Sequence, residues 1–246
     1  MLTRATSTLI KDLKKQKREN CSLLFLDNIK IIKDSINNGI KPLYILVENE
    51  ELKLNIWKDM NVLKVDRKTI EQLSDSRTPQ GVVCITEYPQ YTLEKPKTNF
   101  LVIDKLQDPG NIGTLIRTAT ACGFEYIFLL DSVRISNPKL IRSSVGTIFQ
   151  TKIYSLTTNT FINLFKTWNL PLLKADMNGE NIFNYKSNEK IGVVIGNEGN
   201  GVSNEISKLC SKTVSIPMLK NVESLNASIS GAIIMYQIMK DKLVNK

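Results

Sequence analysis

Gly196-Asn197-Glu198-Gly199-Asn200-Gly201 is the most informative stretch of the chain, because it places backbone N–H groups and small side chains directly after an apolar run. The five residues before it, Ile191–Ile195, are apolar around one glycine and predict a buried strand. Open α/β sheets bind their ligands at the loops where such strands end. The stretch therefore predicts an α/β domain with a ligand site at this loop.

Three other segments also lie where a strand or helix is expected to begin or end. They are Asp108-Pro109-Gly110-Asn111-Ile112-Gly113, Ser215-Ile216-Pro217-Met218 and Glu223-Ser224-Leu225-Asn226-Ala227-Ser228. Asn111 is well placed to cap the helix that follows it, and Ser224 and Asn226 are candidate caps of the last helix. Arg117 falls on the helix after Asn111, where a lone arginine is usually exposed to solvent. Taken one at a time, these residues read as ordinary turns, caps and surface positions.

Two common nucleotide-binding motifs are excluded. Residues 196–203 have the spacing of a P-loop, but Val202 replaces the lysine that contacts the β and γ phosphates. No G-x-G-x-x-G follows any predicted strand, so the dinucleotide fingerprint fails as well. Two interpretations remain: a glycine-rich loop that lets backbone approach a ligand beside the Glu198 carboxylate, or a tight surface turn without a ligand.

The composition narrows the function further. A net charge of +9 favours a polyanionic partner. The chain has no histidine, which excludes histidine acid–base chemistry, Ser-His-Asp triads and histidine metal ligands. Its four cysteines are far apart and predict neither a zinc site nor a disulfide framework. With no signal core and no apolar stretch of membrane-spanning length, we expect a cytoplasmic protein.

The apolar and turn patterns divide the chain into two α/β regions joined by a linker. Residues 88–99 contain two prolines and no periodicity, so the linker is expected there. Strands are predicted at residues 25–26, 42–47, 62–65 and 82–85 before the linker, and at 101–103, 126–130, 152–154, 171–174, 191–195 and 213–216 after it. The main helices after the linker are predicted at residues 112–123, 160–168, 204–209 and 225–243.

Together these positions resemble the SpoU (TrmH-type) family of RNA ribose 2′-O-methyltransferases, within the SPOUT superfamily. The resemblance covers most of residues 78–240 and rests on three motifs in order: Asp108–Gly113 with Arg117-Thr118-Ala119, then Ile195–Gly201, then Ile216-Pro217-Met218 with Val222–Ser228. Asn137-Pro138-Lys139 and Arg142–Gly146 also look like the family. Thr78-Pro79-Gln80-Gly81 is similar to the substrate-binding domain that often precedes this catalytic domain, whereas Phe25-Leu26-Asp27-Asn28 departs from the usual Glu-Gly and leaves substrate choice open.

The resemblance implies an α/β architecture in two domains. Residues 99–246 would form a SPOUT methyltransferase domain with a parallel sheet whose end is tied in a deep trefoil knot. Residues 1–90 would form a small ribosomal-protein-like α/β domain that binds the RNA substrate, with residues 91–98 as the linker. The family acts as homodimers and holds S-adenosylmethionine in a bent shape in the knot loops. The composition itself predicts no metal.

The same resemblance implies a role for each site residue in methyl transfer to a ribose 2′-hydroxyl. The cofactor-binding residues would be Gly196, Asn197, Ile216, Met218 and Leu225. The catalytic residues would be Asn111, Arg117, Glu198, Ser224 and Asn226. Glu198 is expected to orient Arg117 through a charge-assisted pair. The role of Arg117 stays open between a base, a bidentate clamp on the adjacent phosphate and an electrostatic stabiliser of the alkoxide.

Two rival functions make different predictions. A Rossmann-type methyltransferase would carry its glycine-rich loop early in the domain, whereas Gly196 lies far toward the C-terminus. A non-catalytic RNA-binding factor on the same scaffold would lack Arg117, Glu198 or Asn226, and all three are present. Ribosomal RNA is favoured as substrate, transfer RNA remains possible, and housekeeping and antibiotic-resistance methylation are both open.

Overall fold

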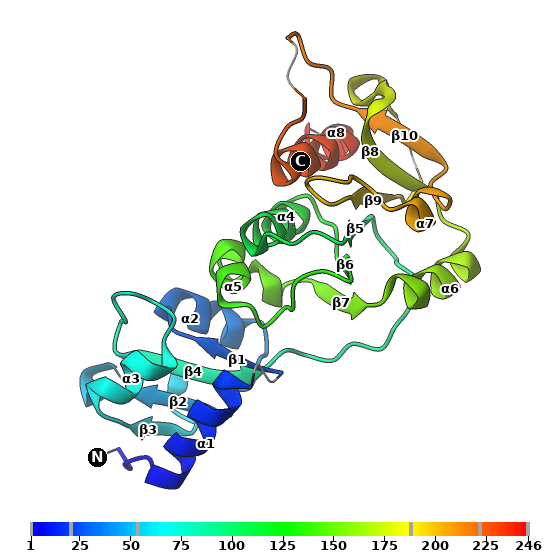
Figure 1. The fold of residues 1–246 in the computed structure, drawn as a ribbon. Helices are drawn as coiled ribbons and strands as arrows, with labels where there is room; N and C mark the ends of the chain where they lie inside the picture. Colours follow the sequence, from blue (N-terminus) through cyan, green and yellow to red (C-terminus); the bar gives the residue numbers. More distant parts are fainter. Residues whose placement is uncertain (1, 20–21, 53–54, 187–188, 221–222, 245–246) are drawn as a thin grey trace. The chain divides into compact units, whose positions relative to one another are not determined.

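The computed structural model describes residues 2–19, 22–52, 55–186, 189–220 and 223–244 of the 246-residue chain. The chain divides into two compact units, each with its own sheet (Figure 1). The first unit comprises the described residues up to Gln90 together with Ile135–Phe149. The second comprises Tyr91–Arg134 and the described residues from Gln150 onward. Among the described residues, no helix has the length and apolarity needed to cross a membrane.

The first unit is built on a mixed four-stranded sheet in the order β1-β4-β2-β3. β4 pairs antiparallel with β1 and β2, and β2 pairs parallel with β3. The strands are β1 (Leu23–Leu26), β2 (Tyr44–Val47), β3 (Val62–Lys64) and β4 (Val82–Glu87). The helices are α1 (Ser7–Arg18), α2 (Ile29–Asn37), α3 (Arg67–Leu73) and α5 (Pro138–Ser144), with the short turns η1 (Glu50–Leu52), η2 (Asn55–Trp57) and η3 (Thr147–Phe149).

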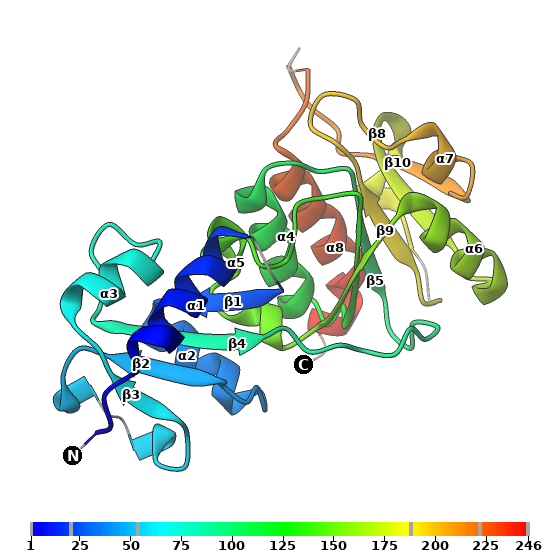
Figure 2. The same ribbon diagram turned by 60° about the horizontal axis from the view of Figure 1, so that its bottom comes forward.

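Helix α1 has one buried residue and a strongly basic surface. Leu13 is buried and packs into the apolar cluster of the first unit, while the helix lies against α3 and β1 (Figure 2). Lys11, Lys15 and Arg18 are exposed to solvent. Leu9 and Ile10 are half-buried and pack on the same cluster, so the opposite surface of the helix is left for charged side chains.

The second unit is built on a six-stranded sheet in the order β10-β8-β9-β5-β6-β7, in which every pair is parallel. This confirms the predicted parallel sheet. The strands are β5 (Phe100–Asp104), β6 (Tyr126–Leu130), β7 (Lys152–Leu156), β8 (Leu172–Asn181), β9 (Gly192–Ile195) and β10 (Lys212–Ser215). The helices are α4 (Pro109–Ala121), α6 (Thr158–Trp168), α7 (Asn204–Ser207) and α8 (Ala227–Val244), with the short turn η4 (Ile182–Asn184).

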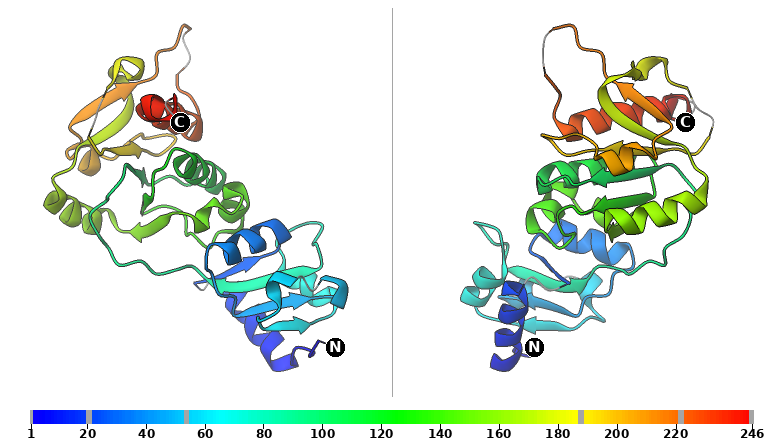
Figure 3. Two further views of the ribbon diagram at one scale, coloured as in Figure 1. Left: turned by 180° about the vertical axis from the view of Figure 1, so that it is seen from behind. Right: turned by 45° about the vertical axis from the view of Figure 1, so that its right-hand side comes forward.

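Helices α4 and α8 lie side by side against the sheet (Figure 3). The apolar stripe predicted for α4 is its buried face: Ile112, Leu115, Ile116 and Ala119 are fully buried. On α8 the closest approach is at Gly231, where an added Cβ would lie 2.3 Å from Cδ2 of Leu115. A side chain at this position would have to displace the fully buried side chain of Leu115, so glycine favours this close packing.

Strand β8 is longer than its sequence predicts. The apolar run ends at Lys174, but the strand continues to Asn181. The extension pairs with β10, through Val214 opposite Glu180 and Ser215 opposite Asn181, after a register shift between Thr213 and Val214. Most residues of this extension are polar and exposed, so they carry no apolar pattern that predicts a strand.

Candidate active site

The site lies at the carboxyl ends of the strands of the parallel sheet, where three of the predicted segments meet. β5 and β9 are neighbours, with Ile103 opposite Ile195, so the loops that follow them leave the same edge of the sheet. The loop after β5 leads into α4, and the loop after β9 is the glycine-rich stretch. The third segment comes from the start of α8, which packs on both α4 and β9.

Helix α4 is capped by Asp108 and not by Asn111. The Asp108 carboxylate accepts a hydrogen bond from the backbone N–H of Asn111 at 2.8 Å. Pro109, which lacks an N–H, occupies the first helical position, where no N–H is needed. The prediction that Asn111 caps this helix is therefore wrong. Asn111 lies in the first turn, and its side chain is left to bond with other segments.

The Asn111 amide joins all three segments. Its Nδ2 donates to Oε1 of Glu198 in the glycine-rich loop at 3.3 Å. Its Oδ1 accepts from Nδ2 of Asn226 at 3.0 Å and from Oγ of Ser228 at 3.3 Å, both at the start of α8. Oε1 of Glu198 also accepts from the backbone N–H of Asp108 at 3.3 Å. We call Asn111, Glu198, Asn226 and Ser228 the asparagine network.

Asn226 has two functions in this network. Its Oδ1 accepts from the backbone N–H groups of Ser228 at 2.9 Å and Ile229 at 3.3 Å, so it also caps α8 as its sequence suggests. The Ser228 hydroxyl lies 2.6 Å from the same oxygen. Ser228 is buried, and sequence reasoning assigned it no role. The signal in the sequence that could have pointed to Ser228 was its hydroxyl, two residues after the predicted helix cap Asn226.

The glycine-rich loop is closed by its own backbone. Asn197 and Gly201 exchange two N–H···O bonds of 2.9 Å each. An added Cβ on Gly196 would lie 2.2 Å from the carbonyl carbon of Gly201, so only glycine fits where the two ends of the loop meet. The tight turn foreseen for this stretch is thus present, and its tip carries the exposed Glu198 side chain.

The Asn197 side chain holds the loop in place. Its Oδ1 accepts from the backbone N–H groups of Gly199 at 3.0 Å and Asn200 at 3.2 Å. Its Nδ2 donates to the carbonyl of Lys105 at 2.9 Å. Because the side-chain amide and the backbone of Asn197 are both engaged within the protein, this residue mainly fixes the shape of the loop.

A buried carboxylate anchors the other end of the loop. Asp104, the last residue of β5, is fully buried, and its Oδ2 accepts from the backbone N–H of Ser203 at 2.6 Å. Sequence reasoning did not single out Asp104. An acidic residue that ends an otherwise apolar strand was the signal, since a buried carboxylate needs a partner.

Arg117 stands apart from the asparagine network. It lies six residues after Asn111, about 9 Å further along α4 and on a different face of the helix. Its side chain is exposed, and no hydrogen bond or ion pair links it to any residue that the structure describes. The expected pair with Glu198 is not formed, because Glu198 bonds with Asn111 and the backbone of Asp108 instead.

The segment between β10 and α8 carries the remaining predicted residues. Ile216, Met218 and Leu225 are half-buried, while Ser224 is exposed. Within the described part of the chain, nothing accepts a hydrogen bond from the backbone N–H of Met218 or Leu225. Val222, which belongs to the third motif, lies outside the described residues. The segment therefore presents free backbone donors beside apolar side chains.

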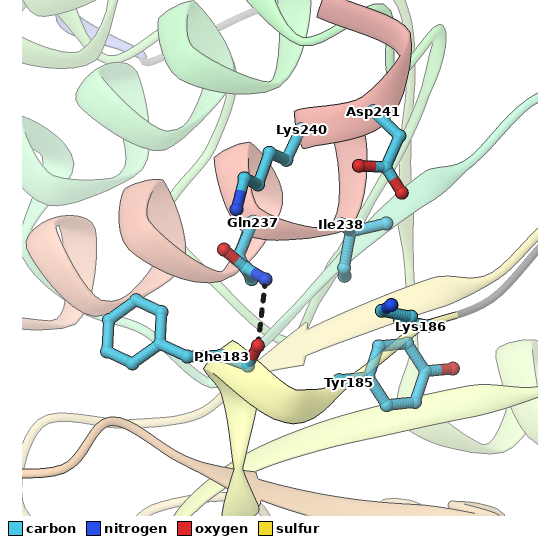
Figure 4. Close-up of a pocket in the computed structure, with 7 residues that line it drawn as sticks. All are labelled: Phe183, Tyr185, Lys186, Gln237, Ile238, Lys240 and Asp241. Atoms are coloured by element: carbon cyan, nitrogen blue, oxygen red, sulfur yellow. Dashed lines mark hydrogen bonds between the residues drawn. The ribbon is translucent and has the colours of Figure 1, made fainter. Parts of the chain in front are cut away.

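A hollow of about 240 Å³ lies elsewhere on the second unit, between the η4 region and the far half of α8 (Figure 4). Gln237 donates to the carbonyl of Phe183 there at 3.3 Å. Gln237 is eleven residues beyond Asn226, which corresponds to about 17 Å along α8. None of the predicted site residues lines this hollow. In the described ranges, no cluster of three or more His, Cys, Asp or Glu side chains is arranged to hold a metal ion.

Comparisons with known proteins agree with this arrangement. The chain is 23% identical over 241 residues to the 23S rRNA (guanosine(2553)-2'-O)-methyltransferase RlmP of Bacillus subtilis, covering 95% of this chain and 97% of that protein. It is 25% identical over 249 residues to a 23S rRNA (uridine(2479)-2'-O)-methyltransferase of Streptomyces viridochromogenes, covering 93% and 86%. The crystal structure of an AdoMet-bound rRNA methyltransferase from Sinorhizobium meliloti shares the fold, with a TM-score of 0.84, 23% identity and coverage of 98% and 97%.

The family model described as the SpoU rRNA Methylase family matches residues 98–236, which is more than half of the chain and spans the three motifs joined by the asparagine network. The chain therefore belongs to the SpoU rRNA methylase family.

Proposed function

We propose that this protein is an S-adenosylmethionine-dependent RNA methyltransferase that modifies a ribose 2′-hydroxyl, with ribosomal RNA favoured over transfer RNA. The asparagine network carries the proposal, because it brings one residue from each motif to the same edge of the sheet. The names of the Bacillus subtilis and Streptomyces viridochromogenes relatives support ribosomal RNA as the substrate class. An enzyme acting on such RNA belongs in the cytoplasm.

The residues present fit the cofactor. Adenine has apolar faces and hydrogen-bond acceptors along its edge. The half-buried side chains of Ile216 and Leu225 suit the faces, and the free backbone N–H groups of Met218 and Leu225 suit the edge. Gly196 is half-buried and has no side chain, so a ligand could approach its backbone closely. When bound, the cofactor would supply a methyl group activated by a positively charged sulfur.

The protein's own task is to align the ribose oxygen and to stabilise the charge that develops on it. As the oxygen–carbon bond forms, the carbon–sulfur bond to the methyl group breaks, and the proton of the 2′-hydroxyl passes to solvent. Asn111 and Glu198 offer an amide and a carboxylate near that reaction, and Asn226 fixes the orientation of the Asn111 amide. Positioning of this kind is a large part of the rate enhancement in such transfers.

Arg117 has three possible roles, of which we favour two. A guanidinium with a pKa above about 12 is a scarce base near neutral pH. Its planar fork suits either a bidentate clamp on the neighbouring phosphate or electrostatic stabilisation of the alkoxide. The exposed and unpaired state of Arg117 within the described chain leaves the guanidinium available to RNA.

We assign RNA binding to the first unit. Lys11, Lys15 and Arg18 on α1 are exposed, and Lys14 and Lys17 are half-buried on the same helix. Basic side chains gathered on one helix contact phosphates and make affinity fall as salt is added. The target nucleotide would lie in a loop or bulge, where its 2′-hydroxyl can enter a site.

We also infer a knotted chain end and a homodimer. β10 lies at the sheet edge beyond β8, yet the next helix, α8, packs on α4 and β9 nearer the middle of the sheet. This return path is what a knotted end requires. On α8, Ile229 and Tyr236 are 53% and 49% exposed, and a second copy of the chain would cover these apolar side chains.

Two measurements test the proposed function. Isothermal titration with S-adenosylmethionine should show binding at one site per chain. Mapping of ribose methylation in total RNA, with and without the protein, should reveal a nucleotide whose modification depends on it. Absence of cofactor binding would reduce the protein to an RNA-binding factor, and cofactor binding without any new ribose methylation would mean a different acceptor.

A further inference from the structure

A hollow of about 420 Å³ lies beside the asparagine network at the carboxyl ends of β5, β6 and β9. Six residues that line it are Lys105, Gln107, Asp131, Asn197, Asn200 and Ser203. β6 and β7 follow β5 on one side of the sheet, whereas β9 lies on the other side. Open α/β sheets bind ligands in the crevice where the strand order reverses in this way.

The backbone is strained at two residues of this hollow. Lys105 has φ of 56° and Asp131 has φ of 44°, so both adopt the left-handed conformation that side chains disfavour. Each residue directly follows a strand, β5 or β6, and the Lys105 N–H donates to the carbonyl of Leu130 at 2.9 Å. Strain of this kind is concentrated at binding sites, where it fixes side chains in a required position.

Two side chains that line the hollow are held by hydrogen bonds within the protein, and each of them keeps one oxygen without a described partner. Oδ2 of Asp131 accepts from Oγ1 of Thr158 at 2.6 Å and from the Thr158 N–H at 3.0 Å, and these bonds lower the pKa of Asp131. Nε2 of Gln107 donates to the carbonyls of Lys105 at 3.1 Å and Asp131 at 3.4 Å. Oδ1 of Asp131 and Oε1 of Gln107 bond with nothing in the described part of the chain.

The cationic donor of the hollow, the Lys105 ammonium, also lacks a described partner. The Lys105 ammonium lies close enough to Asp131 to favour its ionised form, and it forms no hydrogen bond or ion pair with a described residue. Fixed acceptors beside a free cationic donor match a planar group that carries an N–H next to a carbonyl oxygen. A bare phosphate is disfavoured, because the Asp131 carboxylate would repel it.

The hollow and the asparagine network are two sides of the same pair of loops. Gln107 is followed by Asp108, whose N–H donates to Glu198. Asn197, which precedes Glu198, donates to the carbonyl of Lys105. The two sites therefore share the loops after β5 and β9, and we take the base of a nucleotide whose ribose lies at the network to enter the hollow.

We propose that this hollow binds the base of the nucleotide whose ribose is methylated, and that it selects a base with an N–H beside a carbonyl oxygen, namely guanine or uracil. The inference rests on the proposed function, because it takes that ribose to lie at the asparagine network. The Asp131 carboxylate accepts from the ring N–H, and the Lys105 ammonium donates to the carbonyl oxygen. Adenine has no carbonyl, and the ring nitrogen beside the carbonyl of cytosine carries no hydrogen.

Direct binding of short RNAs tests this without requiring methylation. Fluorescence anisotropy with ten-residue oligouridine, oligocytidine and oligoadenosine should show that oligouridine binds the intact protein about 5-fold to 100-fold more tightly, as one bidentate base contact allows. Asp131→Asn should reduce this preference to about 1. Asparagine suits a positive φ and keeps an acceptor for Thr158, so this variant is expected to fold. Asp176→Asn and Lys208→Met, at exposed positions outside the hollow, should keep the preference.

Lys105→Asn separates a binding role from a structural one. Asparagine relieves the left-handed strain, so the melting temperature should stay the same or rise while the uridine preference falls. Equal binding of the three oligonucleotides by the unaltered protein would overturn the proposal. So would a loss of S-adenosylmethionine affinity in Asp131→Asn with the uridine preference retained, since the hollow would then hold part of the cofactor. Failure of the proposed methyl transfer itself would instead show in the methylation map, which these binding measurements do not use.

Discussion

Nδ2 of Asn226 donates to Oδ1 of Asn111 at 3.0 Å, and this bond joins the first turn of α4 to the cap of α8 across 115 positions of sequence. It is the direct link between the first and third motifs of the family. Because Oδ1 of Asn226 is occupied by backbone N–H groups of α8, the orientation of its amide is fixed, and so is the donor presented to Asn111.

Asn226→Asp should separate stability from catalysis. Aspartate keeps the oxygen that caps α8, so the melting temperature should stay close to that of the parent. It loses the donor to Asn111 and places a carboxylate against Oδ1 of that residue, so methyl transfer should fall at least about 10-fold, as expected for loss of a positioning hydrogen bond to a reacting centre. Asn226→Ala should lose activity and also about 1 kcal/mol of stability, through loss of the cap. Full activity in Asn226→Asp would remove the network from the mechanism.

Arg117 should matter for turnover and hardly at all for stability. Its exposed side chain has no described partner, so Arg117→Ala should change the free energy of unfolding by no more than about 0.5 kcal/mol. Arg117→Lys keeps the charge but loses the planar fork. Single-turnover methylation by this variant should be strongly reduced if Arg117 acts through bidentate geometry. Undiminished turnover would leave only a general electrostatic role.

Glu94 should give the second unit a pH-dependent contribution to stability. A short bond from Lys152, together with bonds from Lys97 and Tyr126, lowers the pKa of Glu94 to about 2. A depressed carboxyl pKa stabilises the fold above the unfolded value, near about 4.3, and this contribution is lost as the pH falls toward 2. Urea unfolding at pH 7, 4 and 3 should therefore show a smaller pH dependence for Glu94→Gln than for the parent. The same pH dependence in both proteins would contradict this assignment.

Gly231→Ala should destabilise the packing of α8 on α4. The added methyl group would lie 2.3 Å from Cδ2 of Leu115, and overpacking of this kind costs about 1–3 kcal/mol. Ser230→Ala, one position earlier on the same helix, provides a control with no such collision. Chemical denaturation of the two variants measures the difference. Equal stability would mean that the helices separate more easily than their packing suggests.

The basic helix α1 should dominate the salt dependence of RNA binding. Replacing Lys11, Lys15 and Arg18 by glutamine should weaken binding to RNA of any sequence. The slope of log affinity against log salt should fall by about 0.7 to 0.9 for each phosphate contact removed. Filter binding from 50 to 200 mM salt, a range on the order used for such slopes, supplies the measurement. An unchanged slope would place the RNA contacts elsewhere.

Much of the fold could be read from local patterns. Tyr126–Leu130 is a strand in both sequence and structure, and the α4 stripe is buried as its spacing predicts. These succeed because burial imposes a period on apolar residues. The second half of β8 could not be read, since its partner strand lies more than thirty residues away and its own residues are polar.

Three residues of the asparagine network could be predicted from the sequence, but the bonds between them could not. The motifs name Asn111, Glu198 and Asn226, and the structure brings these three together. The partner of Glu198 could not be predicted from the sequence. Whether Glu198 bonds with Asn111 or with Arg117 depends on which face of α4 meets the loop. Asp108 caps α4 because the proline after it occupies the first helical position. Which of the two residues, Asp108 or Asn111, would be the cap could be decided only from the folded turn.

The lack of a side chain at Gly231 matters for more than the density of packing between α8 and α4. Gly231 lets α8 pack closely on Leu115 of α4, and Asn226 lies about 7.5 Å from Gly231 along the helix axis. The close packing there helps to hold Asn226 next to Asn111. If the asparagine network takes part in methyl transfer as proposed, a bulkier residue at position 231 should slow the reaction before it unfolds the protein.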